Sequence, residues 1–256
     1  MTRRTSLMAA VSVAAALAAS ATNASAQFGN FVIPPANAAV EGGTSVSNVL
    51  QGAEATIQML WKGSNLTGVG PGNVTGIWFR LNEGSASFPV GPYSWTSYAI
   101  RMSTSSGPLT TDLTANELGS TLVRSGGLSL ASGDFTGGAT PNAFSFFIPF
   151  STPFFYSGGD LFLSIRHGNG AIAFQDASVD ATITAPTDVL SSIAVASSES
   201  ATTGTVIGGP NGGGTIGLAV VAQLQVSEVV PEPATVALMG AGLLGLMAVA
   251  SRRRRA

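Results

Sequence analysis

Short apolar runs, in which every second residue is hydrophobic, are the feature that most constrains the fold of this 256-residue chain. In the run at 54–62, Ile57, Met59 and Trp61 alternate with other residues, and the longest such alternation occupies 215–226. A period of two places successive side chains on opposite faces of a strand, so each run predicts one β-strand with an apolar face. Further runs of this kind lie at 74–82, 98–103, 143–150 and 160–167.

Turn-forming Gly and Pro residues separate these runs, for example at 68–73, 137–142 and 208–214. Only 111–119 has a helical pattern, which would begin at Thr111 or Asp112 and end at Gly119. Short strands divided by turns predict an all-β fold, an antiparallel β-sandwich or jelly roll, with a barrel as the nearest alternative. The apolar faces are expected to form one core, while outward Ser, Thr and Arg side chains meet water.

The N-terminal residues have the three parts of a secretory signal peptide. A basic pair, Arg3 and Arg4, precedes an apolar run, and the small residues Ala24 and Ala26 form an Ala-x-Ala cleavage site. We therefore predict that residues 1–26 are a signal peptide, which signal peptidase removes after export through the general secretion machinery. The paired arginines leave twin-arginine export as the alternative route.

The exported part, residues 27–229, is acidic and contains no cysteine. It has twelve acidic and five basic residues, which gives a net charge of about −7, although the whole chain carries only −2. Nucleic acids are bound through lysine and arginine, so this balance argues against nucleic acid as a partner. A segment of about 200 residues can bury a sufficient core without disulfides, so we expect one domain.

An uncharged apolar stretch at 234–250 is followed by four arginines, Arg252, Arg253, Arg254 and Arg255. A helix of this length reaches about 25 Å, slightly less than a hydrocarbon core of about 30 Å. We predict a single C-terminal transmembrane helix, whose arginines form a cytoplasmic stop and leave the domain outside. A plain membrane anchor would need no further feature.

A Pro-Glu-Pro sequence, formed by Pro231, Glu232 and Pro233, stands directly before this stretch. Two prolines hold the backbone extended, which is how protease active sites generally accept a chain. Pro-Glu-Pro, a short apolar span and an arginine cluster follow one another over residues 230–256. This order closely resembles the PEP-CTERM sorting signal of Gram-negative bacteria.

The resemblance implies how the protein is handled. Exosortase, a polytopic membrane protease or transpeptidase, is expected to act at Pro231, Glu232 and Pro233, so that the mature protein lacks the tail from about Pro233 onward. The precursor would be held transiently in the inner membrane, and the processed protein would pass to the cell surface, usually in species that make extracellular polysaccharide. The segments 100–110 and 153–170 also resemble β-rich domains that are often joined to such tails and have no assigned activity.

The exported part offers few residues for catalysis. A Ser-His-Asp triad would have to use His167, which stands just after an apparent strand, and no Gly-x-Ser-x-Gly motif accompanies it. The aspartates available to a glycosidase lie in segments where aspartate commonly shapes turns, namely Asp134, Asp160, Asp176 and Asp180. Zinc would lack ligands, and no pattern names a calcium ligand. We therefore expect no enzymatic activity, no cofactor and no named metal ligand.

Aromatic residues offer a different kind of site. Trp61 and Tyr98 fall on the apolar faces of their strands, whereas Trp78 lies opposite Ile77 and Phe79, on the side of Arg80. Trp78 is therefore the candidate for stacking against a sugar ring. Two functions follow: a non-catalytic surface or extracellular-matrix protein associated with exopolysaccharide or biofilm, or alternatively a carbohydrate-binding or carbohydrate-active β-sandwich. The missing catalytic constellation favours the first.

Overall fold

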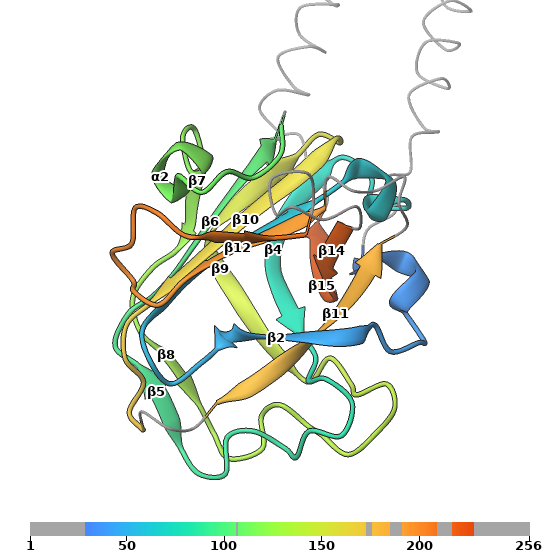
Figure 1. Ribbon diagram of the computed structural model, residues 1–256. Coiled ribbons are helices and arrows are strands. Elements are labelled where there is room, and N and C mark those ends of the chain that lie inside the picture. Colours follow the sequence, from blue (N-terminus) through green and yellow to red (C-terminus); the bar gives the residue numbers. More distant parts are fainter. Residues whose placement is uncertain (1–28, 106, 173–175, 185–190, 209–216, 228–256) are drawn as a thin grey trace, which may run out of the picture.

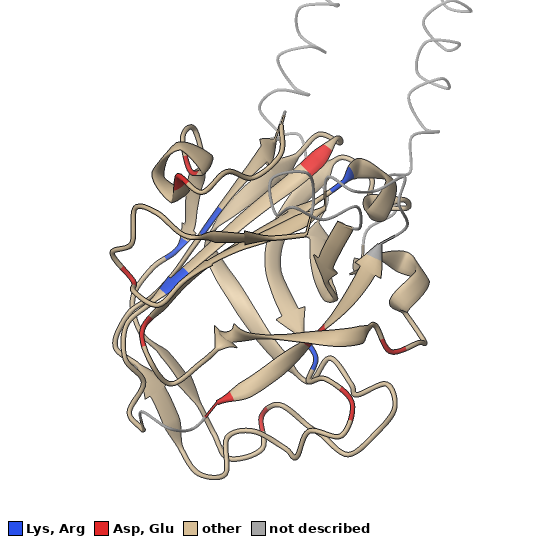
Figure 2. Cartoon of the chain, in the orientation of Figure 1, with Lys and Arg blue, Asp and Glu red and all other residues tan. Residues whose placement is uncertain are grey.

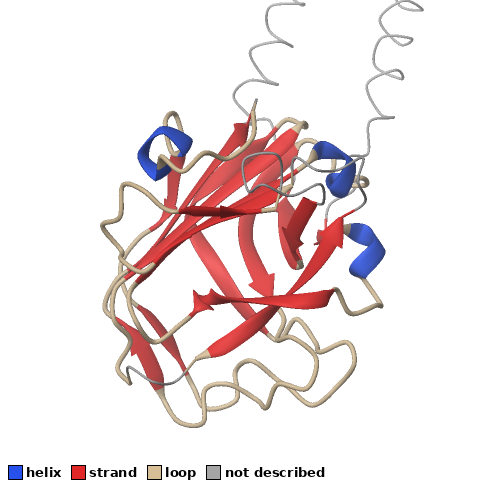
Figure 3. Ribbon diagram, in the orientation of Figure 1, coloured by secondary structure: helices blue, strands red, loops and turns tan. Residues whose placement is uncertain are grey.

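A computed structural model describes residues 29–105, 107–172, 176–184, 191–208 and 217–227 of the chain. Strands dominate these ranges, and their helices are short (Figure 3). The helices are the α-helix α2 (Leu113–Asn116) and the 3₁₀ helices η1 (Pro35–Asn37) and η2 (Gly63–Leu66). All strand pairs are antiparallel, so the predicted all-β antiparallel fold is confirmed.

The largest sheet carries apolar side chains on both of its faces. Its six strands are, in spatial order, β13 (Thr205–Ile207), β12 (Ser192–Ala196), β3 (Ala55–Trp61), β10 (Asp160–His167), β6 (Tyr98–Ser105) and β7 (Thr121–Arg124). As predicted, β3 turns Ile57 and Trp61 into the main core. On the opposite face, Leu60 and Phe162 pack with Leu113 of α2 in a second, smaller cluster. The predicted helix at 111–119 is thus present as one short turn that covers this sheet.

The second sheet contains the strands at both ends of the described chain. Its four strands are, in spatial order, β1 (Gly29–Ile33), β15 (Ala222–Ser227), β4 (Gly72–Phe79) and β9 (Phe146–Tyr156). Ile77 and Phe79 of β4 point into the main core together with Leu224 of β15. Pro149 lies within β9, where the missing N–H is tolerated because β9 is at the edge of this sheet.

Two smaller sheets complete the enclosure of the main core (Figure 1). One consists of β14 (Gly217–Val220), β11 (Ala177–Thr184) and β2 (Gly43–Leu50), and the other of β5 (Tyr93–Trp95) and β8 (Leu128–Leu130). The two largest sheets meet where β7 lies beside β9, and the Ser151 hydroxyl donates to the carbonyl oxygen of Val123 at 3.1 Å. The described strands therefore form four sheets, instead of the two of a simple sandwich.

The run at 215–226 differs from its prediction. Its alternation predicts one strand, but its described residues form two, β14 and β15, which belong to different sheets. Val221 lies between them, and its N–H donates to the carbonyl oxygen of Asp180 at 2.9 Å. Val220, Val221 and Ala222 are all buried, because the chain passes from one sheet to the next inside the protein.

Arg80 is the clearest exception to the predicted alternation. Its side chain is expected in water, yet the residue is only 1% exposed. Its Nε and Nη2 donate to Oδ2 of Asp180 at 2.9 and 2.6 Å, and Nη2 also donates to the carbonyl oxygen of Val40 at 2.6 Å. The N–H of Gly42 donates to Oδ1 of Asp180 at 3.0 Å. Burial of these charges is tolerated because each has close partners, which join three separate segments of the chain.

The buried pair yields a prediction about stability. Replacing Arg80 with Met leaves the Asp180 carboxylate buried without its counter-charge, so Arg80→Met should lower the free energy of unfolding by about 3–5 kcal/mol. The matched control is Lys62→Met, because Lys62 pairs with Asp160 at 2.9 Å but its side chain is 35% exposed. That change should cost no more than about 1 kcal/mol. Denaturant unfolding followed by tryptophan fluorescence measures both, and equal losses would contradict the special role of Arg80.

Candidate functional site

The residues predicted to direct export and sorting lie outside the described residues. They are the cleavage-site residues Ala24 and Ala26, the motif residues Pro231, Glu232 and Pro233, and the arginines Arg252, Arg253, Arg254 and Arg255. The predicted transmembrane helix at 234–250 also lies outside them. Within the described ranges, no helix combines the length and the apolar character needed to cross a membrane. The structure bears on these predictions only through the strands that adjoin them.

Those two adjoining strands pair with each other. β1 and β15 are antiparallel neighbours, with Gly29 opposite Val226. β1 begins three residues after Ala26, and β15 ends four residues before Pro231. Four residues span at most about 14 Å. The predicted export and sorting sites therefore adjoin the same end of one strand pair.

His167 is the last residue of β10 and is fully buried, so it does not lie in a loop. Its Nε2 lies 2.9 Å from the carbonyl oxygen of Asn48, and its Nδ1 lies 3.0 Å from that of Gly168. The imidazole stacks on Tyr98, with 5.6 Å between ring centroids and an interplanar angle of 8°. Within the described ranges, both ring nitrogens face backbone carbonyls, so this histidine lacks the serine and carboxylate partners of a catalytic triad.

The four aspartates considered for a glycosidase also have structural partners. Asp134 accepts from the N–H of Ala131, Asp160 from Gly63 and Lys62, Asp176 from Gly52, and Asp180 from Gly42 and Arg80. Only the bond to Asp134 is local, as in the turn-shaping role that aspartate commonly has. The backbone N–H groups that donate to the other three aspartates lie 97 to 138 residues away along the chain, so these aspartates join distant segments. Among the described residues, no group of three or more His, Cys, Asp or Glu side chains could hold a metal ion.

Glu41 lies beside the Arg80–Asp180 pair. Its Oε1 accepts from the N–H of Glu83 at 2.7 Å, while Oε2 is shielded from solvent without a hydrogen-bond partner in the described part of the chain. Burial raises the pKa of Glu41, and the negative charge of Asp180 raises it further. Burial also raises the pKa of Asp180, against the lowering effect of its bonds with Arg80. The carboxyl groups of Glu41 and Asp180 are therefore more easily protonated than free carboxyl groups. The bonds between Arg80 and Asp180 join the end of β4 to β11.

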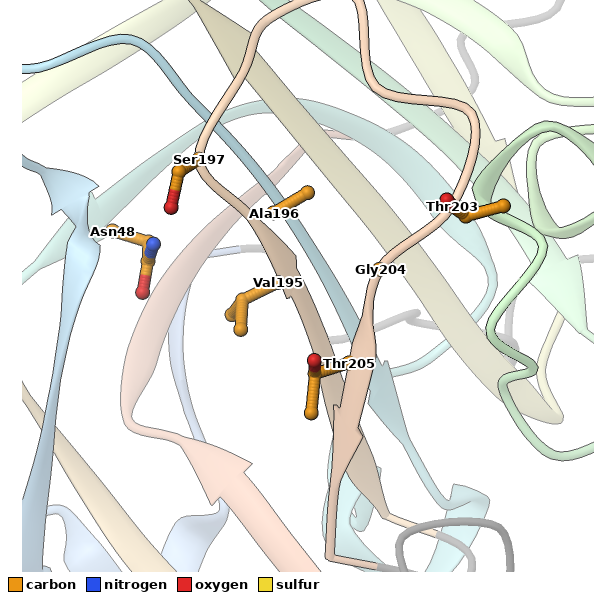
Figure 4. A pocket seen from close by; sticks show the side chains of 7 residues that line it. All are labelled: Asn48, Val195, Ala196, Ser197, Thr203, Gly204 and Thr205. Atoms are coloured by element: carbon orange, nitrogen blue, oxygen red, sulfur yellow. The ribbon is translucent and has the colours of Figure 1, made fainter.

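A polar depression of about 440 Å³ lies between β2 and the hairpin of β12 and β13. Figure 4 shows Asn48 of β2 facing this hairpin, which supplies the remaining lining residues, Val195, Ala196, Ser197, Thr203, Gly204 and Thr205. The lining contains neither a charged nor an aromatic side chain. It can accept polar groups but has no side chain suited to acid–base catalysis.

Trp78 lies on the outer face of β4 and is partly exposed, whereas Trp61 and Tyr98 are fully buried, as the strand period predicts. The register of β4 and β9 places Trp78 directly opposite Phe147, which is also partly exposed. Their ring centroids lie 4.3 Å apart with an interplanar angle of 36°. This aromatic pair is the described feature best suited to stack against a ligand ring.

Phe147 is the member of this pair that the sequence pattern does not single out. In the run at 143–150, Phe146 and Ile148 share the apolar face, so the alternation leaves Phe147 on the opposite face. Trp78 likewise lies opposite the apolar face of its own run. The sequence does not show the register between the two strands, and the register is what brings the two rings together.

Comparison with known proteins identifies the C-terminal segment. Residues 229–255 match the family model of the PEP-CTERM protein-sorting motif. No curated protein and no solved structure matches the chain. The matched residues contain the Pro-Glu-Pro sequence, the apolar stretch and the arginine cluster, in the order that the sequence predicts. The chain therefore carries a PEP-CTERM protein-sorting motif at residues 229–255.

Proposed function

We propose that a signal peptide at 1–26 exports this protein, that a helix at 234–250 holds it in the inner membrane, and that exosortase then cuts it at the Pro-Glu-Pro sequence. The observation that carries the proposal is the match of residues 229–255 to the sorting motif. This motif implies sorting by exosortase to the cell surface. The signal peptide and the membrane-spanning helix complete the proposed route.

The positions of the described strands support this route. β15 ends at Ser227, before the motif, and β1 begins at Gly29, after the proposed signal-peptide cleavage site. Neither proposed cut lies within a described strand, so both cuts leave the hydrogen bonds between the strands of the four-stranded sheet intact. The short connections also keep the domain close to the membrane until processing is complete.

The Pro-Glu-Pro sequence provides the direct test of sorting. Replacing Pro231, Glu232 and Pro233 by alanines leaves the apolar stretch and the arginines intact, so membrane insertion should persist. Exosortase should no longer process the variant, which should accumulate as an uncleaved protein in the membrane fraction. Cell fractionation with immunoblotting, in a strain with a working exosortase, measures this outcome.

The matched control for this test is Glu228→Ala, because Glu228 is also acidic but lies outside the matched residues 229–255. Glu228→Ala should be processed like the wild type. Release of the triple-alanine variant at the wild-type level would mean that the motif is not the processing signal. The protein would then be a simple anchored surface protein.

For the processed domain, we propose a non-catalytic role at the cell surface or in the extracellular matrix, in association with extracellular polysaccharide. The partly exposed Trp78 and Phe147 rings support binding, because aromatic faces can stack against sugar rings. The alternative, a carbohydrate-active enzyme, has less support, since His167 and the four aspartates already bind groups of the protein itself.

A hydrolysis assay separates these two roles of the domain. The purified protein, incubated with the polysaccharide of its own host, should release no new reducing ends, because the side chains that would act as acid and base are engaged in structural hydrogen bonds. A hydrolysed standard run in parallel shows that the assay detects cleavage. Sustained release that disappears in an Asp134→Asn or Asp176→Asn variant would assign the domain to the enzymes instead.

A further inference from the structure

The outer face of the four-stranded sheet presents two rows of side chains that cross all four strands. One row consists of Val32, Gln223, Trp78 and Phe147, and the next of Asn30, Gln225, Gly76 and Pro149. The residues between them along the strands, such as Ile77, Ile148 and Leu224, belong to the main core. The two rows therefore face outward. Each extends about 15 Å across the four strands, because adjacent strands lie about 4.8 Å apart.

This face carries no charge. The strands β1, β4, β9 and β15 contain neither an acidic nor a basic residue along their whole lengths, and Figure 2 shows β4, β9 and β15 without blue or red. A polyanionic ligand would find no arginine or lysine here to bind it. An uncharged ligand needs no such partner, so the composition of the face favours a neutral one.

Gly76 provides the space that the Phe147 ring occupies. A Cβ atom added at Gly76 would lie 2.2 Å from two ring carbons of Phe147 and 2.8 Å from the carbonyl oxygen of Ile148. The ring thus leans over the glycine, next to Trp78, where any other residue would displace it. The strand register shifts between Val74 and Gly76. The missing side chain of Gly76, beside this irregularity in the register, lets the Phe147 ring lie close against the sheet next to Trp78.

Amide side chains flank the aromatic pair. The Thr75 hydroxyl donates to Oε1 of Gln225 at 2.7 Å, which holds the side chain and leaves its NH₂ group to donate elsewhere. Gln223 stands directly beside Trp78 in the strand register, and its amide has no hydrogen-bond partner within the described ranges. An amide both donates and accepts, which matches the hydroxyl groups of a sugar.

We propose that this face binds a neutral polysaccharide, with a sugar ring stacked on Trp78 and Phe147 and its hydroxyl groups bonded to Gln223 and Gln225. The inference rests on the proposed association of the domain with polysaccharide, and it adds a site and a ligand class. Pyranose rings have an apolar C–H face and a polar edge. An aromatic pair beside amide side chains is complementary to both.

The face is long enough for a chain of several sugars. Phe155, which is 53% exposed, lies opposite Asn73 in the register of β9 and β4. Asn73 is five residues from Trp78 along β4, which corresponds to about 15 Å. A polymer that follows the strands can contact the Trp78–Phe147 pair at one end and Phe155 at the other. An oligosaccharide should therefore bind more tightly than its monosaccharide.

The test measures binding of the full chain to immobilised polysaccharides by biolayer interferometry. The protein is kept in a zwitterionic detergent without a sugar headgroup, because a maltoside or glucoside would compete for the site. The neutral probes are a mixed-linkage β-glucan, a galactomannan and dextran, and alginate is the polyanionic probe. The wild type should bind at least one neutral probe and should not bind alginate.

Two independent variants remove the platform in different ways. Trp78→Ala removes one ring, and Gly76→Ala displaces the other. Each should weaken binding at least about tenfold, the effect of losing a central aromatic contact. Trp78→Phe should retain most of the affinity, because a ring remains. The matched control is Gly70→Ala, since a Cβ atom at Gly70 would meet nothing within 4 Å.

The outcomes separate this inference from the proposals on which it rests. Thermal melts establish that each variant is folded, and Phe147→Ala replaces Gly76→Ala if the latter fails to fold. Wild-type affinity in the Trp78 and Gly76 variants would overturn the platform while leaving polysaccharide association intact. Binding to alginate alone, or to none of the four polymers, would overturn it as well. Weaker self-association of the variants by light scattering, without any glycan binding, would instead identify the face as a contact between two copies.

Discussion

The buried ion pair of Arg80 and Asp180 is the interaction on which the outer surface of the four-stranded sheet depends. Arg80 directly follows β4 and lies on the same side of the chain as Trp78, two residues earlier. At Arg80 this side is closed by the carbonyl of Val40 and by the ring of Phe144, whose centroid is 5.2 Å from the guanidinium carbon. At Trp78 it is partly open to solvent. Because a guanidinium can stay buried only with its partners, the pair fixes where the covered side ends and the aromatic surface begins.

The strands follow from local alternation, and this explains how much of the fold the sequence predicts. Ile57 and Trp61 point into the core as their spacing indicates, because the period of a strand is a local property. The partner of each strand depends on residues far away. Arg80 is buried by a residue one hundred positions further along the chain, and the division of the run 215–226 at Val221 depends on a bond to Asp180. The local alternation therefore predicts neither the burial of Arg80 nor the division at Val221. The pairing of Phe147 with Trp78 likewise depends on the register between two strands, which the sequence pattern does not show.

The sorting signal is the opposite case. Its parts are contiguous, and the order of Pro-Glu-Pro, apolar span and arginines is fully present in the sequence, so the match at 229–255 agrees with the prediction. The structure adds the setting of that signal. β15, which leads to the motif, pairs with β1, the first described strand, so the proposed export and sorting cuts adjoin the same end of one strand pair. Under the proposed processing, a domain attached in this way is released whole, and its outer sheet face becomes available to the extracellular surroundings.

The intact mass of the wild-type protein, recovered from the surface of cells that have a working exosortase, tests the central claim most directly. Exported and sorted protein should lack residues 1–26 and the tail from about Pro233 onward, while the strands from Gly29 to Ser227 remain. Exosortase-deficient cells should yield a membrane-bound form that keeps this tail. A surface-recovered mass that still includes residues 234–256 would contradict the account and would leave an anchored protein whose motif is not a processing site.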